Sequence, residues 1–199
     1  MEMVNGEFIV VNAGDDVSLP ERTERLVGVW LKSNRRAKLV HSAARRIDES
    51  SQPSKLQRPP KWMRTHPTPL TIIEKKGFVI GATAAWDKSI YSDFGPLGEY
   101  ISTEDVLLPF RAALYHEVSY LDESLVNWRT GGISNNVAQM TGRHYLYGLS
   151  HKGRKWWAEI DRYILERFAD RSYPDKALIE AVCRQRAPGL QFCVDLAEA

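Results

Sequence analysis

A polar stretch, GGISNNVAQMTGRHYLYGLSHKGRKWW (residues 131–157), contains the residue types that could read a nucleic acid. On a helix over 133–141, the side chains of Asn135, Asn136 and Gln139 fall on the side away from its apolar residues. Amide side chains of this kind can pair bidentately with adenine in the major groove. The spacing therefore indicates a short recognition helix.

Positive charge surrounds these amides. Between residues 129 and 155 there are 5 basic residues and no acid, whereas residues 67–128 have 4 basic and 9 acidic residues. Local positive potential attracts phosphates even when the net charge is only +2. The flanking candidates for phosphate contact are Arg129, Arg143, His144, Lys152, Arg154 and Lys155. The alternative is that the asparagines cap a helix and the basic side chains are only solvated.

The same stretch resembles a winged helix-turn-helix. Ile133, Val137 and Met140 would pack inward from the second helix, and YLYGLSHKGRKW is similar to the strand-to-helix junction of winged-helix regulators. The resemblance covers roughly residues 117–168. It implies that the helix over 133–141 enters the major groove and that the wing touches the DNA backbone.

A second basic region lies between residues 22 and 64, with 12 basic residues against 3 acidic ones. Its end, residues 49–69, has five prolines and reads as a linker or an extended arm, because proline removes backbone donors. This secondary basic surface comprises Arg35, Arg36, Arg45, Arg46, Arg58, Lys61, Trp62 and Arg64. Trp62 is the tryptophan that we expect to contact a partner.

Hydrophobic periodicity predicts a mostly helical α+β protein. A short strand is expected over 8–11, and a long helical stretch over 21–49, which the SNRR sequence could divide into two helices. A small hairpin is expected over 70–81. Further helices are expected from Ser102 or Thr103 to near Trp128, from about 152 to 170, and from Pro174. Residues 190–196 fit a last strand. The helical C-terminal half would hold the winged helix-turn-helix. We divide the chain into residues 1–66 and 67–199, although a single domain is also compatible.

Catalytic and metal signatures are weak in this sequence. His116–Glu117 lacks the second histidine of a zinc peptidase, and the glycines of GFVIGATAAW lack the phosphate-loop lysine. His116 and Glu123 could share a helix face and hold a metal, but a polar surface is the preferred reading. The two cysteines are expected to be buried free thiols. We expect no cofactor and no metal.

The sequence therefore predicts a non-catalytic nucleic-acid-binding protein, with DNA favoured over RNA, acting as a transcriptional regulator and homo-oligomer. The alternatives are a structural protein that packages nucleic acid in a virus or phage, and an enzyme of unrecognised class. Because no apolar run reaches 18 residues and the N-terminus does not resemble a signal peptide, a cytoplasmic location is expected.

Overall fold

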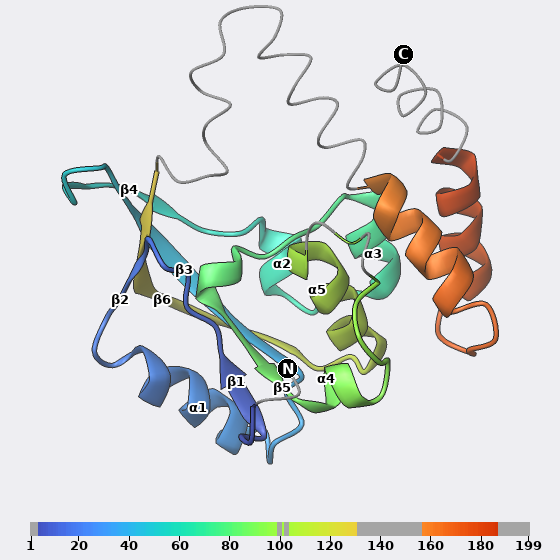
Figure 1. The fold of residues 1–199 in the computed structure, drawn as a ribbon, viewed down its shortest axis with the longest axis horizontal. Coiled ribbons are helices and arrows are strands. Elements are labelled where there is room, and N and C mark those ends of the chain that lie inside the picture. The colour runs from blue at the N-terminus through green and yellow to red at the C-terminus, as the bar shows by residue number, and fades with distance from the viewer. Residues whose placement is uncertain (1–3, 99–100, 102–103, 131–156, 187–199) are drawn as a thin grey trace, which may run out of the picture.

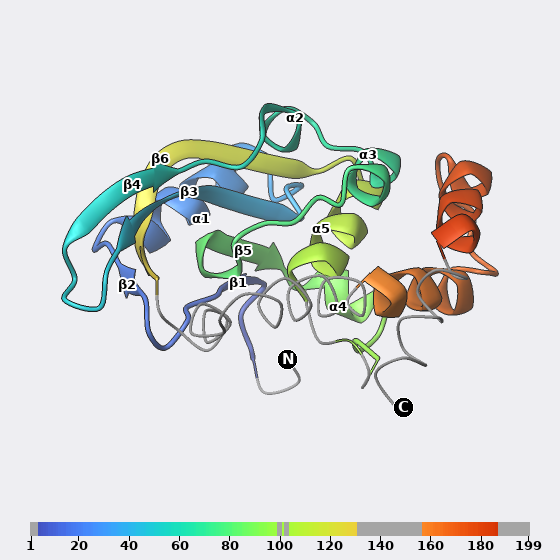
Figure 2. The ribbon, with the colours of Figure 1, turned by 90° about the horizontal axis from the view of Figure 1, so that it is seen from above.

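The computed structural model describes residues 4–98, 101, 104–130 and 157–186. Its centre is a curved, mixed sheet of six strands that forms a half-barrel (Figures 1 and 2). The order along the sheet is β1-β5-β3-β6-β2, and β4 pairs with β3. The strands are β1 (Phe8–Val10), β2 (Val17–Ser18), β3 (Leu39–Ile47), β4 (Pro53–Gln57), β5 (Ala84–Asp87) and β6 (Val118–Arg129).

Only β3 and β6 pair in parallel; the other strand pairs are antiparallel. The helices are α1 (Arg22–Lys32), α2 (Lys61–Arg64), α3 (Pro69–Glu74), α4 (Ser89–Ser92) and α5 (Glu104–Leu114), with the 3-10 turn η1 (Gly81–Thr83) before β5. Two further helices span 157–167 and 176–186. No helix among the described residues is long and apolar enough to cross a membrane.

The sheet buries both of its faces. Leu39 on β3 is in register with Trp86 on β5, and both face the larger core beside α3 and α5. The next register pair, Val40 and Ala85, faces Leu26 and the rest of α1 on the opposite side. Because successive side chains of a strand point to opposite faces, one strand supplies both cores. Figure 1 shows α1 on one side of the sheet and α3 and α5 on the other.

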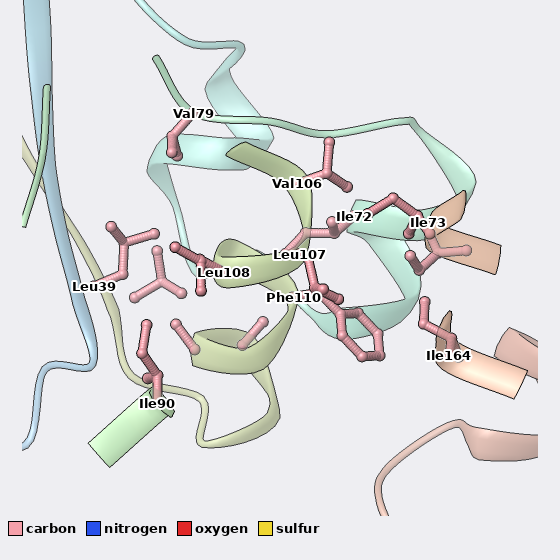
Figure 3. Close-up of a cluster of buried hydrophobic side chains, with 14 of the residues drawn as sticks. Leu39, Ile72, Ile73, Val79, Ile90, Val106, Leu107, Leu108, Phe110 and Ile164 are labelled. Carbon is pink, nitrogen blue, oxygen red and sulfur yellow. The ribbon is translucent and has the colours of Figure 1, made fainter. Parts of the chain in front are cut away.

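Helix α5 is the centre of the larger core. Figure 3 shows its apolar side chains between Leu39 of β3, the isoleucines of α3 and Ile164 of the helix over 157–167. Eight consecutive residues after Asp105 in α5 are buried, including Pro109, which lies inside the helix. A helix that is apolar on all sides must be enclosed. This enclosure fixes the position of the α5 N-terminus, which lies at the candidate site described below.

Several sequence predictions are wrong. The stretch over 21–49 is helical only as α1: Asn34 and Arg35 have φ values of 54° and 61°, which end the helix, and β3 follows. The expected helix up to Trp128 stops at Leu114, and the rest is β6, paired in parallel with β3. The mostly helical fold class is thus corrected to a mixed sheet with helices on both faces.

The expected hairpin over 70–81 is also wrong. Thr68 caps α3 in a reciprocal capping box with Thr71, and Pro69 occupies the first turn, where its missing N–H is no loss. The proline-rich region over 49–69 is not a free arm: it contains β4 and α2, and Met63 is completely buried.

Other predictions are confirmed. The strand near residues 8–11 is β1, the helix start near Thr103 is that of α5, and helices span 157–167 and 176–186. Cys183 is a buried free thiol. Three predictions fall outside the described residues. They are the recognition helix over 133–141, the buried thiol of Cys193 and the last strand over 190–196. The sheet takes strands from both sides of residue 66.

Candidate active site

A cavity of about 760 Å³, which we call the acidic cavity, is the candidate binding site. It lies where the end of β1, η1, the segment after β5 and the start of α5 come together. Its walls are formed by Val11, Gly81, Trp86, Lys88, Tyr91, Ser92, Gly95, Pro96, Leu97, Glu104, Asp105 and Leu108. Most of this lining is apolar or aromatic, and the two carboxylates stand side by side at the first turn of α5.

Asp105 is the most perturbed acid in this cavity. Burial, and then the neighbouring Glu104 carboxylate, raise the pKa of Asp105 to about 7, and the backbone N–H of Gly81 offsets part of that rise. Its Oδ1 is buried and has no hydrogen-bond partner. A carboxyl group that titrates near neutral pH inside a cavity can take or give a proton under ordinary conditions.

Gly81 makes this arrangement possible. A Cβ at this position would lie 2.5 Å from Oδ1 of Asp105, closer than side chains can approach. The Val79 amide also donates to the Asp105 carbonyl oxygen at 3.0 Å, which ties the segment before η1 to the start of α5. The carboxyl group is therefore held against the η1 backbone.

Arg22 connects segments that surround the cavity. Its side chain is fully buried in the first turn of α1, and its Nη2 donates to the carbonyl oxygens of Val11, Ala82 and Ala84 at 2.6, 2.6 and 3.3 Å. These carbonyl groups belong to the end of β1, η1 and β5. Arg22 therefore connects three segments that line or adjoin the acidic cavity.

A second polar cluster stands next to the cavity. Asp87 accepts hydrogen bonds from Trp30 Nε1 at 3.1 Å, Lys38 Nζ at 3.2 Å and the Ser89 backbone at 3.0 Å. Burial alone would raise the pKa of Asp87, but the hydrogen bonds from Ser89, Lys38 and Trp30 outweigh it and hold that pKa below its usual value. The carboxylate of Asp87 thus has several hydrogen-bond donors and a structural role, in contrast to that of Asp105.

The structure does not test the predicted nucleic-acid site as a whole. Eight of its nine residues lie outside the described residues, namely Asn135, Asn136, Gln139, Arg143, His144, Lys152, Arg154 and Lys155. Arg129 is described, and its guanidinium donates to the carbonyl oxygens of Asp15, Asp48 and Glu49. It therefore joins the end of β6 to two turns of the same chain.

The secondary basic surface is largely occupied by contacts within the chain. Arg35 pairs with Glu7 at 2.8 Å, Arg36 with Glu117 at 3.8 Å and Arg58 with Asp122 at 2.7 Å.

The remaining members are spread over separate elements. Arg46 stacks on Trp128, Arg64 on Tyr120, and the half-buried Trp62 lies under Lys75. Arg45 and Lys61 are exposed. His116 and Glu123, whose shared helix face was the less favoured alternative of a metal pair, do not lie on one helix, because β6 begins between them. No metal-binding cluster is found among the described residues.

No family model and no curated protein matches the chain. Among solved structures, it is similar to S. aureus TarS 1–349 in complex with UDP, with a TM-score of 0.48 and 14% sequence identity. The match covers 98% of this chain, which spans 64% of the TarS chain.

The prediction of a non-catalytic DNA-binding regulator is corrected by the described fold. That fold is a half-barrel sheet with helices on both faces, not the mostly helical DNA-binding fold that the prediction required. The comparisons do not test the winged-helix resemblance, because no family model matches the chain.

Sequence reasoning missed Asp105 as a site residue. The STED sequence correctly predicted a helix start, but acids in a first turn are common because they complement the helix dipole. Only the approach of Gly81, 24 positions earlier in the sequence, buries this carboxyl group.

Proposed function

We propose that the acidic cavity is the active site of an enzyme that acts on a carbohydrate, with Asp105 as the general base. The observation that carries this proposal is the Asp105 carboxyl group, which lines the cavity with an unpartnered Oδ1 and a pKa raised to about 7. A base of this pKa is half ionised near neutral pH and can accept the proton of an attacking hydroxyl group.

The cavity lining supports a carbohydrate as the substrate. A sugar ring has an apolar C–H face, which suits the aromatic walls formed by Trp86 and Tyr91. Its hydroxyl groups suit the polar groups of Ser92, Lys88 and Glu104 at the same cavity. In the proposed step, Asp105 takes the proton of one sugar hydroxyl while that oxygen forms a bond to the group being transferred. The bond between that group and its leaving group, such as the UDP of a UDP-sugar, breaks at the same time, and the leaving group keeps the electron pair.

Two measurements test the proposal. Saturation-transfer NMR with glucose, galactose and N-acetylglucosamine should detect binding that Tyr91→Ala weakens. Release of UDP from UDP-glucose and UDP-N-acetylglucosamine, with the sugars as acceptors, tests transfer, and ATP serves as an unrelated nucleotide. The proposal does not depend on which donor works. It fails if no sugar binds, or if Asp105→Asn leaves every detected activity intact.

A further inference from the structure

A second cavity, of about 250 Å³, shares none of its described lining residues with the acidic cavity. It lies between the start of β3, the segment after β4 and the loop after α3. Three cationic side chains, Arg58, Lys75 and Lys76, line it, and no Asp or Glu occurs among its described lining residues. We call it the basic cavity. A small cavity with a positive lining favours an anion.

The three cationic side chains differ in how much of their charge is available to a bound anion. Arg58 forms an ion pair with Asp122 at 2.7 Å, so most of its charge is compensated. Lys75 and Lys76 are exposed, and Lys75 Nζ lies 5.4 Å from the ring centre of Trp62. The two lysines are therefore the principal source of positive potential at this cavity.

The floor of the cavity contains an unusual histidine. His41 lines the cavity, is 1% exposed and has a buried Nε2 without a hydrogen-bond partner. Burial lowers the pKa of His41 to about 4, so its ring is neutral at pH 7, and the hydrogen bond to the Met63 backbone offsets only part of that shift. A neutral histidine that donates to a backbone carbonyl oxygen from one nitrogen can only accept at the other.

Aromatic side chains complete the wall. Trp62 packs so closely on Gly77 that no Cβ would fit there, which holds the indole ring against the loop that carries Lys75 and Lys76. Phe78 lines the same cavity and is 58% exposed. The described lining of the cavity thus offers two exposed cations, one buried acceptor and apolar ring surface.

From this combination we infer that the basic cavity is a binding site for a small sugar phosphate. The phosphate group lies against Lys75 and Lys76, and a sugar hydroxyl group donates to His41 Nε2. The C–H face of the sugar packs on Trp62. Inorganic phosphate supplies only the anion and a neutral sugar only the hydroxyl group, so each satisfies half of the site.

Calorimetric titration of the full chain with glucose 6-phosphate, inorganic phosphate and glucose tests this inference. Glucose 6-phosphate should bind saturably, about tenfold more tightly than phosphate, and the binding of glucose alone, which is expected at the acidic cavity, should not change in the Lys75→Gln/Lys76→Gln variant. Lys75→Gln/Lys76→Gln should weaken glucose 6-phosphate binding by about tenfold. The matched control, Lys55→Gln/Lys61→Gln, removes two exposed lysines outside the cavity and should change the affinity by less than about twofold. Equal losses in the two double variants, or equal affinities for phosphate and glucose 6-phosphate, would overturn the site.

A second measurement reports on His41 without a substitution in the core. In the ¹⁵N-histidine-labelled chain, the Nε2 resonance of His41 should shift with glucose 6-phosphate and stay in place with inorganic phosphate. Binding of glucose 6-phosphate without that shift would refute the hydroxyl contact and with it the sugar phosphate. Because these readouts involve no turnover, they are independent of Asp105 and of the activity proposed for the acidic cavity.

Discussion

At the scale of single residues, the contrast between Asp87 and Asp105 separates a structural carboxylate from a reactive one. Asp87 accepts several hydrogen bonds and has a lowered pKa, whereas Asp105 is held in a poorly solvated position and has a raised pKa. Hydrogen bonds to a carboxylate favour its charged form, and burial without them favours the neutral form. The second environment is the one that produces a base for use near pH 7.

Asp105→Asn should abolish proton transfer while keeping the size of the side chain. We expect a fall in rate of about 10²–10⁴-fold, the usual contribution of a general base. In the parent protein, the rate should rise with pH through an apparent pKa near 7, because only the ionised carboxylate accepts a proton. Initial rates between pH 5 and 9 measure both effects. A pH-independent parent rate would argue against Asp105 as the base.

The same substitution should affect stability in a pH-dependent way. The pKa of Asp105 is raised on folding, so the folded state binds more protons and loses stability as the pH rises from about 4 to 7. Asp105→Asn removes that loss. We expect the variant to be more stable than the parent by about 4 kcal/mol at pH 8 and almost equal at pH 4, as measured by urea unfolding. Equal pH profiles for the two proteins would mean that Asp105 has an ordinary pKa.

Substitution of Gly81 should reduce activity, as substitution of the neighbouring Asp105 does. Gly81→Ala places a methyl group 2.5 Å from Oδ1 of Asp105, so the carboxyl group must move. We expect activity to fall by at least about tenfold, because a displacement of about 1 Å can cost a hundredfold in rate. Gly28→Ala in α1 is the matched control, since nothing lies within 4 Å of its Cβ position. It should keep full activity and gain up to about 1 kcal/mol of stability.

At the scale of elements, β3 explains why the sequence predicted a helix where a strand forms. Its residues Leu39 to Ala44 are all buried, because helices cover both faces of the sheet. A strand that is buried on both faces loses the alternation of polar and apolar residues. Leu39, Val40, Ala43, Ala44 and Ile47 then reproduce the three- and four-residue spacing of a helix.

Other elements were predictable to different degrees. Helix α1 and the start of α5 follow local signals, namely a proline before the first turn of α1 and acids in the first turn of α5. By contrast, β6 forms because it pairs with β3, about 80 residues earlier, and no local pattern reports that pairing. The candidate site joins segments near residues 11, 81 and 105, so its composition could not be read from any single stretch.

At the same scale, the hydrogen bonds of Arg22 should be essential for holding the end of β1, η1 and β5 together. Arg22→Met keeps much of the apolar stem but removes the Arg22 donor from the carbonyl oxygens of Val11 and Ala82, whereas the carbonyl oxygen of Ala84 still accepts from the Val11 amide. We expect a loss of about 3 kcal/mol in the free energy of unfolding, since buried unsatisfied acceptors cost about 1–3 kcal/mol each and do not add fully. Arg25→Met, one turn later, removes an exposed ion pair with Glu123 and should cost less than about 1 kcal/mol. Similar costs for both variants would contradict the bracing role.

At the scale of the whole molecule, the helices over 157–167 and 176–186 complete the larger core beside α5. Arg111 of α5 is fully buried and donates to the Tyr163 hydroxyl group and, at 3.0 Å, to the Ile90 carbonyl oxygen. It also donates at 2.9 Å to the carbonyl oxygen of Gly95, which lines the acidic cavity. The C-terminal helices thereby support the wall of the candidate active site, although they contribute none of its described lining.

Phe168 provides the sharpest test of this support. It is 1% exposed and its ring meets those of Phe94, Phe110, Tyr163 and Tyr173 at centre distances of 5.4–6.0 Å. Phe168→Ala should cost about 3–5 kcal/mol of stability, because it removes a buried ring and leaves a cavity. Because Phe94 immediately precedes the segment that lines the acidic cavity, sugar binding there should weaken as well.

Leu178→Ala is the control, since Leu178 is 58% exposed in the helix over 176–186 and its loss should cost less than about 1 kcal/mol. Urea unfolding followed by tryptophan fluorescence, together with sugar binding at a temperature where both variants stay folded, separates the two effects. If Phe168→Ala is as stable as Leu178→Ala, the helix over 157–167 does not belong to the core. If Phe168→Ala is destabilised but binds sugar as the parent does, the aromatic cluster stabilises the fold without shaping the acidic cavity.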